Sequence, residues 1–429
     1  MCQRMPHESN NDEAARGIRM TPKIKQETTA MNGDEAVAFA VKQCDVDVVA
    51  AYPITPQTII VEKFSEYVAN GEVQTEFICT ESEHSAMTAC LAASATGART
   101  FTASASAGLA LMHEMLFVTS GSRTPVVMAV ANRALSAPLN IHGDHSDSMA
   151  ERDSGWLQIY VENAQEAYDS IIQAFKIAEE VGVSLPIIVG LDGFTISHTL
   201  ERVDVLSEDV VKKFVGERQF PMVLTHEGKT VPFKLDPENP MTMGPNALQN
   251  YYFEFKRQQV EGMNNALKGI QEANSEYAKI SGRSYGNGLI DPYKLDDAEI
   301  AIVCIGSTAG TLKVIVDQLR EEGMKAGVLR LRTFRPLPVE ELRNALKNVK
   351  AVAVMDKSMS PGGLGAPVFN EVRNALYDIK QHPIIVNYIF GLGGRDSSPR
   401  DLRRIFEDLT KIAKTGVAEK QVHYLGLRE

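Results

Sequence analysis

The sequence lacks clustered cysteines and any long apolar run, and each absence excludes a class of protein. Its cysteines show no C-x-x-C spacing, which argues against a zinc or iron–sulfur motif in this chain and favours a reducing compartment. No stretch of roughly 18 or more residues is apolar throughout, and residues 1–30 lack the apolar core of a signal peptide. We therefore expect a soluble cytoplasmic protein without a membrane span. The five cysteines are Cys2, Cys44, Cys79, Cys90 and Cys304.

Positive charge is also scarce. The chain has 44 Lys and Arg residues against 55 Asp and Glu residues, which gives a formal net charge of −11. An acidic surface of this size does not attract phosphodiester backbones or anionic lipids, so we expect neither a nucleic-acid partner nor a membrane partner. A small anionic substrate remains compatible with the sequence if its local site is positive.

The sequence does contain a regular alternation of short β-branched strands and amphipathic helices. With 429 residues the chain is long enough for two or more cores. Continuous apolar strands such as PVVMAVA (125–131) are typical of parallel sheets covered by helices on both faces, so the predicted fold class is α/β with two doubly wound domains. We expect a disordered or arm-like segment over residues 1–30 and a first domain over 31–205. An irregular connector with a helix is expected over 206–290, a smaller second domain over 291–415 and a tail over 416–429.

The segment YPITPQT places a threonine and a proline directly after a strand. Thr55 fits the N-cap, and Pro56 the first position, of a helix that runs to Ala69. The free N–H groups and the positive dipole end of such a helix would suit a carboxylate ligand. A plain capped helix start without a ligand fits the same residues.

The segment TESEH follows the next strand and holds Glu83 at a helix start. Thr80 and Glu83 have the spacing of a capping box, in which Glu83 would hydrogen-bond the Thr80 backbone. In the alternative interpretation Glu83 points into an apolar cleft, where its carboxylate would bind a ring nitrogen of a cofactor.

A long polar loop over residues 131–155 directly follows a central strand. Ligands of open parallel sheets bind at that edge, and long polar loops are often functional. We favour a substrate loop in which Arg133 pairs with a carboxylate, because a guanidinium offers a bidentate fork to a planar anion. A solvated surface loop and a His/Asp metal site at HGDHSD are the alternatives, and we assign no metal to this chain.

The C-terminal half contains two glycine clusters and one arginine-rich stripe. The clusters PGGLGA (361–366) and GLGGR (391–395) fit neither a G-x-G-x-x-G fingerprint nor a P-loop, so we expect tight turns there. The stripe LRLRTFRPLP (329–338) carries Arg330, Arg332 and Arg335, which we expect to face water or a partner subunit.

Taken in order, these segments resemble the α subunits of the pyruvate:ferredoxin oxidoreductases, within the thiamine-diphosphate-dependent 2-oxoacid:ferredoxin oxidoreductase family. The resemblance runs from residue 31 to residue 415, and its motifs lie in both predicted domains. The motifs are YPITPQT (52–58), TESEHSAM (80–87), FTASASAGLALMHE (101–114), ANRAL (131–135), GDHSDSMAERDSGW (143–156), LDGFTISH (191–198) and LRTFRPLP (331–338).

The resemblance implies a pyrimidine-binding-type first domain and a transketolase C-terminal-like second domain. It places Glu83 at the aminopyrimidine ring of thiamine diphosphate, where a carboxylate favours the tautomer that removes the thiazolium C2 proton. It places Thr55 and Arg133 at the carboxylate and carbonyl of the 2-oxo acid, and we add Asp144 and His145 to the predicted substrate-binding set. The implied reaction is oxidative decarboxylation of pyruvate with coenzyme A to acetyl-CoA and CO2, or its reverse, with ferredoxin as the electron carrier.

Thiamine enzymes bind the diphosphate and its Mg²⁺ through a G-D-G motif, which this sequence lacks. The resemblance therefore implies one catalytic subunit of a hetero-oligomer, whose β subunit carries the diphosphate motif, Mg²⁺ and a [4Fe–4S] cluster. Subunits of γ and δ type, ferredoxin and coenzyme A complete the predicted partners. Three alternatives stay open: the same chemistry on 2-oxoglutarate, a branched-chain 2-oxo acid or oxalate; a transketolase-like transferase; and a non-catalytic assembly subunit. The assembly subunit would dock its partners through the surface of net charge −11 and through Arg330, Arg332 and Arg335.

Overall fold

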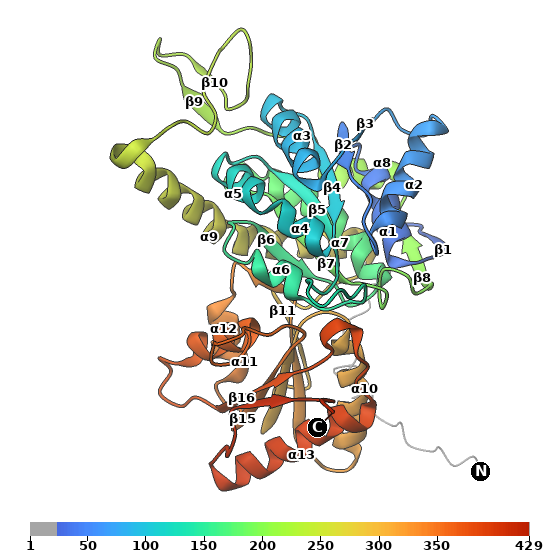
Figure 1. The fold of residues 1–429 in the computed structure, drawn as a ribbon, viewed down its shortest axis with the longest axis vertical. Helices are drawn as coiled ribbons and strands as arrows, with labels where there is room; N and C mark the ends of the chain where they lie inside the picture. Colours follow the sequence, from blue (N-terminus) through green and yellow to red (C-terminus); the bar gives the residue numbers. More distant parts are fainter. Residues whose placement is uncertain (1–23, 429) are drawn as a thin grey trace, which may run out of the picture.

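Two mostly parallel β-sheets, one in each half of the chain, form the framework of the computed structural model, which describes residues 24–428 (Figure 1). The first sheet has the strand order β14-β6-β7-β5-β4-β2-β3, and β14 alone among these strands runs antiparallel to its neighbour. This arrangement confirms the predicted α/β fold class. The strands are β2 (Val48–Ala51), β3 (Glu76–Cys79), β4 (Thr100–Ser104), β5 (Val126–Asn132), β6 (Leu157–Tyr160), β7 (Ile187–Asp192) and β14 (Thr333–Arg335).

Alternate residues of the central strand β5 pack on opposite faces of the first sheet, as the period of two in a strand requires. Val127 and Ala129 join the core beneath α1, α2 and α7, whereas Val126 and Met128 join the core beneath α3, α4 and α5. Both faces of the sheet are therefore covered. The helices are α1 (Gly33–Gln43), α2 (Thr58–Ala69), α3 (Glu83–Thr96), α4 (Ser106–Leu111), α5 (His113–Gly121) and α7 (Ala164–Glu179).

The second sheet has the strand order β11-β13-β12-β15-β16-β17, with β11 antiparallel and the other strands parallel. One hydrophobic core lies under α10 and α13, and another lies under α11 and α12. Its strands are β11 (Ile290–Tyr293), β12 (Ile300–Cys304), β13 (Ala326–Leu331), β15 (Ala351–Asp356), β16 (Ile384–Ile389) and β17 (Val422–Tyr424). Its helices are α10 (Thr308–Glu321), α11 (Val339–Leu346), α12 (Pro367–Leu376) and α13 (Pro399–Thr415).

Two segments expected to be irregular contain strands. The strand β1 (Glu27–Met31) covers the end of the expected arm and the first residue of the expected first domain, and it pairs antiparallel with β8 (Glu201–Val205). The expected tail contributes β17, which pairs with β16 at the edge of the second sheet. Both were missed because such short edge strands depend on a partner far away in the sequence. Residues 1–23 of the expected arm lie outside the described part of the chain.

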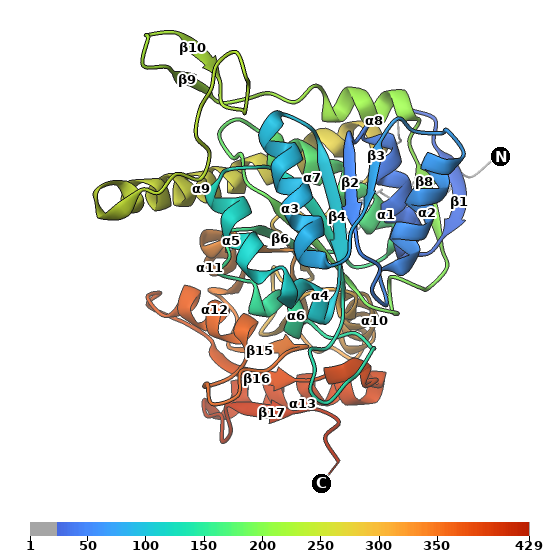
Figure 2. The same cartoon turned by 45° about the horizontal axis from the view of Figure 1, so that its top comes forward.

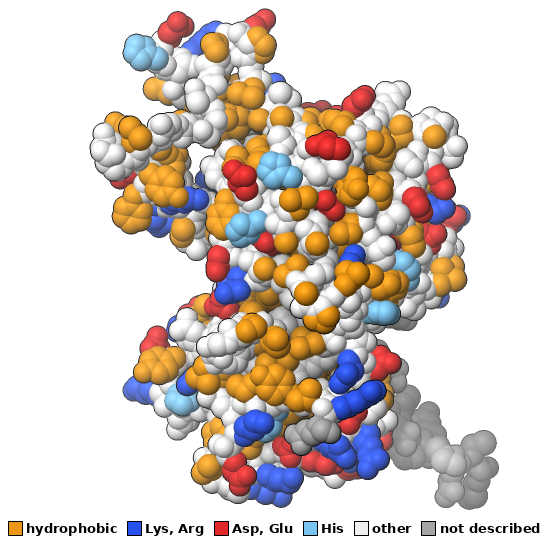
Figure 3. Space-filling view, viewed as in Figure 1, with side chains coloured by type: hydrophobic (Ala, Val, Ile, Leu, Met, Phe, Trp, Pro, Cys, Tyr) orange, Lys and Arg blue, Asp and Glu red, His pale blue; other side chains and the backbone are white. Residues whose placement is uncertain are grey.

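The connector between the domains projects from the first domain. It consists of α8 (Glu208–Val215), a hairpin of β9 (Met222–Leu224) and β10 (Thr230–Pro232), and the long helix α9 (Leu248–Ser281). Figure 2 shows the hairpin and the start of α9 extending away from the rest of the molecule. Figure 3 shows hydrophobic side chains along this hairpin and helix. Across residues 24–428 no helix, α9 included, combines the length and apolar character that crossing a bilayer requires.

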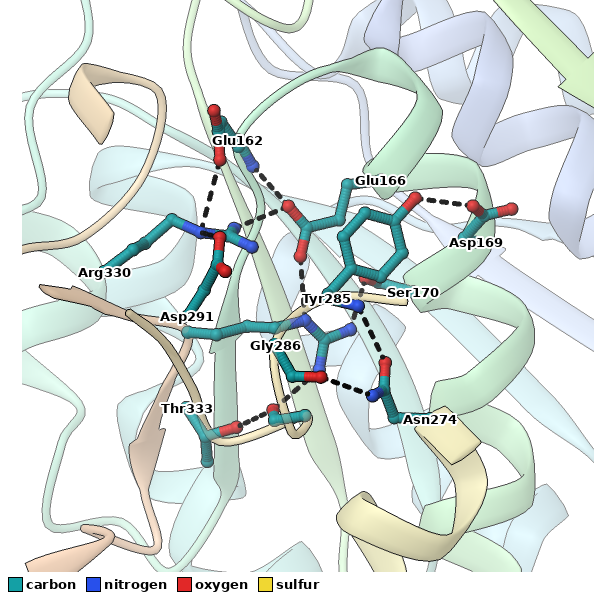
Figure 4. Close-up of polar contacts among 12 residues, drawn as sticks. Glu162, Glu166, Asp169, Ser170, Asn274, Tyr285, Gly286, Asp291, Arg330 and Thr333 are labelled. Atoms are coloured by element: carbon teal, nitrogen blue, oxygen red, sulfur yellow. Dashed lines mark hydrogen bonds and ion pairs between the residues drawn. The ribbon is translucent and has the colours of Figure 1, made fainter. Parts of the chain in front are cut away.

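The arginine stripe corrects a sequence-based expectation, because Arg330 and Arg332 are buried between the two domains and do not face water. Arg330 Nη1 donates to Glu166 Oε2 at 2.5 Å, and Arg332 Nε donates to Glu166 Oε1 at 2.7 Å. Figure 4 shows Glu166 of α7 facing Arg330, with Glu162 and Asp291 also close to Arg330. Burial alone would raise the pKa of Glu166, but the two guanidinium groups outweigh it and hold that pKa below its usual value.

The same stripe continues into the first domain. The strand β14, which lies within this arginine stripe, pairs with β6 of the first sheet. Next to this pair, the Tyr160 backbone N–H donates to the Arg332 carbonyl at 2.8 Å. Arg335, which is mostly buried, donates from Nη2 to Glu371 Oε1 at 2.5 Å and from Nε to the Arg152 carbonyl at 3.0 Å. The segment thus joins the two domains, and these three guanidinium groups are already paired within the chain.

We predict that Arg332→Ala strongly destabilises the protein. The change leaves part of the Glu166 charge buried and uncompensated, and breaking such a pair costs about 3 kcal/mol or more. Urea unfolding followed by circular dichroism measures the loss. The control is Arg257→Ala, which removes an exposed pair with Glu261 on α9 and should shift the unfolding midpoint little. Equal midpoints for the two variants would contradict a stabilising role for the Arg332 pair.

Candidate functional site

The carboxyl ends of the first sheet's strands hold the candidate residues, and this edge faces the second domain. Thr55 follows β2, Glu83 follows β3, and Arg133 directly follows β5. Asp192, the last residue of β7, contacts Lys357 after β15 of the second sheet, from Oδ2 to Nζ at 2.6 Å. The carboxyl edges of the two parallel sheets therefore meet, and ligands of such sheets bind at that edge.

Thr55 does not cap the helix that follows it. Residues 55–57 form a turn, and α2 begins at Thr58 with Gln57 in the N-cap position. The prediction failed because the Gln57 N–H closes the turn by bonding the Ile54 carbonyl at 2.9 Å, so the helical backbone starts later. Gln57 is buried and donates from Nε2 to the carbonyls of Tyr52 (2.9 Å) and Ala103 (3.2 Å). Thr55 is thereby held as an exposed residue at the end of a fixed turn.

Glu83 is the first residue of α3, and it makes no capping box with Thr80. Ser82 is the N-cap and accepts from the Ser85 N–H, while the Thr80 hydroxyl donates to the Ala51 and Ser82 carbonyls. The capping-box alternative is therefore wrong. The local reason is that the Thr80 side chain bonds the Ala51 carbonyl at the end of β2, so it does not cap α3.

Glu83 is buried, with only 6% of the residue exposed, and its carboxylate accepts no hydrogen bond from residues 24–428. Gly108 of α4 lies directly against it, since a Cβ at position 108 would approach Glu83 Oε1 to 2.4 Å. The Ser104 hydroxyl, buried and without a partner among the described residues, lies beside the same position. A buried carboxylate without a partner is costly, so these groups are suited to a ligand that supplies hydrogen bonds.

Arg133 is a buried cation that forms no ion pair with any described residue. Its Nη1 donates to the Thr55 carbonyl at 2.8 Å, and its Nε donates to the Asn140 carbonyl at 3.1 Å. The structure thus brings together Arg133 and Thr55, the two residues that the family resemblance assigns to the substrate, and that assignment stays a prediction. Two neutral carbonyls fix the guanidinium plane without cancelling its charge, which leaves Nη2 available for an anion.

A buried carboxylate, Asp147, organises the backbone around Arg133. Its Oδ2 accepts from the Arg133 and Ser106 N–H groups, both at 2.9 Å, and its Oδ1 accepts from Asn132 Nδ2 at 2.8 Å and Ser148 N at 2.7 Å. Burial raises the pKa of Asp147 to about 6, although these four donors act to lower it. The ends of β4 and β5 are therefore joined through one side chain.

Asp144 and His145 contact the second domain, the neighbouring Ser146 and Asp192, and neither forms a hydrogen bond with Glu83. Asp144 Oδ1 accepts from Ser146, and its Oδ2 accepts from the Gly393 N–H at 2.9 Å. His145 Nε2 lies 2.5 Å from Asp192 Oδ1, and its backbone N–H donates to the Lys357 carbonyl at 2.8 Å. Both residues anchor the loop that carries Arg133, and their direct contact with substrate stays a prediction.

The sequence reasoning assigned no role to several residues that shape the site, namely Gln57, Ser104, Gly108, Asn140, Asp147, Asp192 and Lys357. Asp192 is typical of them, because burial alone would raise its pKa but Lys357 and His145 hold it well below the usual value. Lys357 and His145 lie 165 and 47 residues from Asp192 in the sequence. The motifs DGFTISH and FTASASAG lie at strand ends and could have indicated Asp192, Ser104 and Gly108. A motif does not show which distant residue each side chain contacts, however.

Comparisons with known proteins cover almost the whole chain. Residues 39–275 match the family described as pyruvate flavodoxin/ferredoxin oxidoreductase, thiamine diphosphate-binding, and residues 298–402 match pyruvate:ferredoxin oxidoreductase core domain II. The chain is 49% identical to the pyruvate synthase subunit PorA of Thermotoga maritima over 94% of this chain and 99% of that protein. It is also 49% identical to PorA of Methanocaldococcus jannaschii, over 94% of this chain and 99% of that protein. It is 42% identical to the ketoisovalerate oxidoreductase subunit VorA of Pyrococcus horikoshii, over 93% of this chain and 98% of that protein.

Solved structures share the fold at low sequence identity. A 2-oxoglutarate:ferredoxin oxidoreductase from Magnetococcus marinus superposes with a TM-score of 0.71 and 19% identity over 89% of this chain. This chain spans 65% of the length of that one. A split-gene transketolase superposes with a TM-score of 0.50 and 12% identity, over 89% of this chain and 99% of that one.

We predict a pH-dependent stability contribution from Asp147. Its pKa of about 6 in the folded protein lies above the free value of 3.8, so protonation favours the folded state. The contribution is complete below about pH 4 and is lost as the pH rises through about 6, a change of about 3 kcal/mol. Urea midpoints of the wild type and Asp147→Asn, measured from pH 4.5 to pH 7.5, should therefore separate in favour of the wild type as the pH falls. A difference that does not change with pH would contradict this assignment.

Proposed function

The chain belongs to the pyruvate flavodoxin/ferredoxin oxidoreductase family, and we propose that it is the α subunit of a pyruvate:ferredoxin oxidoreductase. The complex converts pyruvate and coenzyme A to acetyl-CoA and CO2 while two electrons pass to ferredoxin, or it runs this reaction in reverse. The observation that carries the proposal is the buried Glu83 carboxylate, which has no hydrogen-bond donor among residues 24–428 and lies against Gly108.

Glu83 and its surroundings fit the aminopyrimidine ring of thiamine diphosphate. The carboxylate would accept a hydrogen bond from a ring nitrogen and hold the proton at that atom. The glycine at position 108 keeps this side of the carboxylate open, since any larger residue would touch Oε1. When bound, thiamine diphosphate supplies the nucleophilic carbon that attacks the carbonyl of the 2-oxo acid.

Arg133 and Thr55 would bind the substrate. The guanidinium is held by the Thr55 and Asn140 carbonyls and keeps its full charge, so it can pair with the carboxylate of pyruvate. The exposed Thr55 hydroxyl lies on the same fixed turn and can donate to the substrate carboxylate or carbonyl. This local positive site reconciles an anionic substrate with the chain's net charge of −11.

The rest of the active site would come from partner subunits. The chain has no G-D-G motif, so we propose that a β subunit supplies the diphosphate site, Mg²⁺ and a [4Fe–4S] cluster, with γ- and δ-type subunits, ferredoxin and coenzyme A as further partners. Leu111, Phe117 and Val118 support this assembly, because they are exposed apolar side chains on α4 and α5, and Leu111 lies on the same helix as Gly108. The proposed occupant of this surface is the β subunit, because the diphosphate must lie within one cofactor length of Glu83. The cytoplasmic location stays a prediction.

A branched-chain 2-oxo acid is the second candidate substrate. The identity of this chain to VorA (42%) falls at the lower end of its identity to the PorA proteins (42–49%), so pyruvate remains favoured. The burial of Arg330 and Arg332 argues against docking through the arginine stripe in the assembly-only alternative, because these guanidinium groups bind Glu166 within the chain.

We predict that Glu83→Gln lowers pyruvate-dependent ferredoxin reduction by about 100-fold or more, because an amide cannot hold the ring proton. The assay uses the reconstituted complex, and Glu62→Gln, an exposed glutamate of α2, is the matched control. Thiamine diphosphate content, measured after gel filtration, shows whether the loss arises in binding or in turnover. Near wild-type activity of Glu83→Gln would overturn the cofactor assignment.

We also predict that Phe117→Asp prevents stable assembly with the β subunit. A buried, unpaired carboxylate at an apolar interface is strongly unfavourable, so co-purification and thiamine diphosphate retention should both fall. Val314→Asp is the control, because Val314 is an exposed apolar residue on α10 of the second domain. If Phe117→Asp co-purifies with the β subunit as well as Val314→Asp does, the α4–α5 surface is not this interface.

A further inference from the structure

The glycine cluster GLGGR after β16 lies against the loop that carries Arg133. We call residues 391–395 the glycine turn and residues 133–145 the Arg133 loop. Asn140 Nδ2 donates to the Gly393 carbonyl at 2.9 Å, and the Gly393 N–H donates to Asp144 Oδ2 at 2.9 Å. Two hydrogen bonds of opposite direction therefore join one turn of the second domain to one loop of the first.

The Arg133 loop packs so closely on this contact that both positions 393 and 394 need glycine. Gly393 and Gly394 have φ values of +60° and +77°. A Cβ at Gly393 would lie 2.2 Å from Asn140 Nδ2, and one at Gly394 would lie 2.4 Å from the His142 Cβ. Since real Cβ atoms do not approach other atoms so closely, a side chain at position 393 would displace the Asn140 amide, and one at position 394 would press on the Arg133 loop at His142.

Asn140 connects this contact to the guanidinium of Arg133. Its side chain bonds the glycine turn, its Oδ1 accepts from the His142 N–H at 2.8 Å, and its own carbonyl accepts from Arg133 Nε at 3.1 Å. Asn140 is thus fixed by the second domain at one end and fixes Arg133 at the other. A displaced Asn140 would remove one of the two carbonyls that orient the guanidinium.

The far end of the Arg133 loop is anchored to the second domain as well. The His145 N–H donates to the Lys357 carbonyl at 2.8 Å, and Lys357 Nζ donates to Asp192 Oδ2 at 2.6 Å. Ser307, which precedes α10, also donates its backbone N–H to Asp192 Oδ2 at 3.1 Å. The second domain therefore holds the loop at residues 140, 144 and 145. Of these three residues, only Asn140 also bonds the Arg133 guanidinium.

We propose that Asn140 and the glycine turn are positioning elements that set the Arg133 guanidinium for the carboxylate of the 2-oxo acid. The second domain then contributes to substrate binding without touching the substrate, by fixing the loop of its neighbour. This inference rests on the proposed function, in which Arg133 binds that carboxylate. It assigns a role to a glycine cluster that matches no nucleotide-binding motif.

The test measures pyruvate KM and kcat in the reconstituted complex for Asn140→Ala and Gly393→Ala, each made in the wild-type and in the Arg133→Ala background. Gly416→Ala is the matched control, since Gly416 has a φ of +72° in the same domain with no atom near its added Cβ. Thiamine diphosphate content and thermal unfolding of every variant are recorded as measures of intact assembly. Asn140→Ala keeps the loop backbone unobstructed, so the test does not depend on Gly393→Ala folding.

In the wild-type background, we expect Asn140→Ala and Gly393→Ala to raise the pyruvate KM about tenfold and to change kcat less than about twofold. In the Arg133→Ala background, we expect each substitution to raise the KM by less than about twofold further. Gly416→Ala should match the wild type. Equal effects in both backgrounds, or an unchanged KM, would overturn the positioning role while leaving the proposed function intact. If Arg133→Ala itself leaves the KM unchanged, the carboxylate role of Arg133 in the proposed function is wrong, and the positioning role falls with it.

Discussion

The burial of charged groups between the carboxyl edges of two parallel sheets is the constraint on which the rest of this structure depends. Glu166 of the first domain is enclosed by Arg330 and Arg332, and Asp192 at the end of β7 is bound by Lys357 and His145. Such groups are stable in a dry interior only when their partners are held in place, so the two domains cannot drift apart without leaving charges unpaired. The interface is therefore rigid where the candidate site is built.

Two other charged groups at this edge contrast with the paired ones. Glu83 and Arg133 are also buried, yet neither has a partner of opposite charge among residues 24–428. The fold holds both groups in place without neutralising them: Gly108 lies beside the Glu83 carboxylate, and two backbone carbonyls orient the Arg133 guanidinium. Unpaired charges fixed by a rigid frame are typical of preorganised sites, where the missing partner is the ligand. A cofactor ring at Glu83 and a substrate carboxylate at Arg133 would supply what each group lacks.

Local features of the sequence predicted local structure well. The apolar run PVVMAVA (125–131) was expected to form a buried strand and forms β5 (Val126–Asn132), because its pattern lies within consecutive residues. The burial of Arg330 could not be predicted, since its partner Glu166 is 164 residues away and only the tertiary fold brings them together. β6 and β14 were missed because strands this short carry little periodicity of their own. The role of Glu83 came from the family resemblance, whereas its lack of hydrogen-bond donors is visible only in the structure.

The most direct test of this account is a structure of the assembled complex, determined by electron cryo-microscopy with thiamine diphosphate and pyruvate bound. The account predicts the aminopyrimidine ring within hydrogen-bond distance of the Glu83 carboxylate and the pyruvate carboxylate on the Arg133 guanidinium. It further predicts that the diphosphate lies in the partner subunit and that the Asn140 contact with Gly393 is unchanged. A cofactor bound away from Glu83, or a substrate carboxylate paired with a cation other than Arg133, would contradict it.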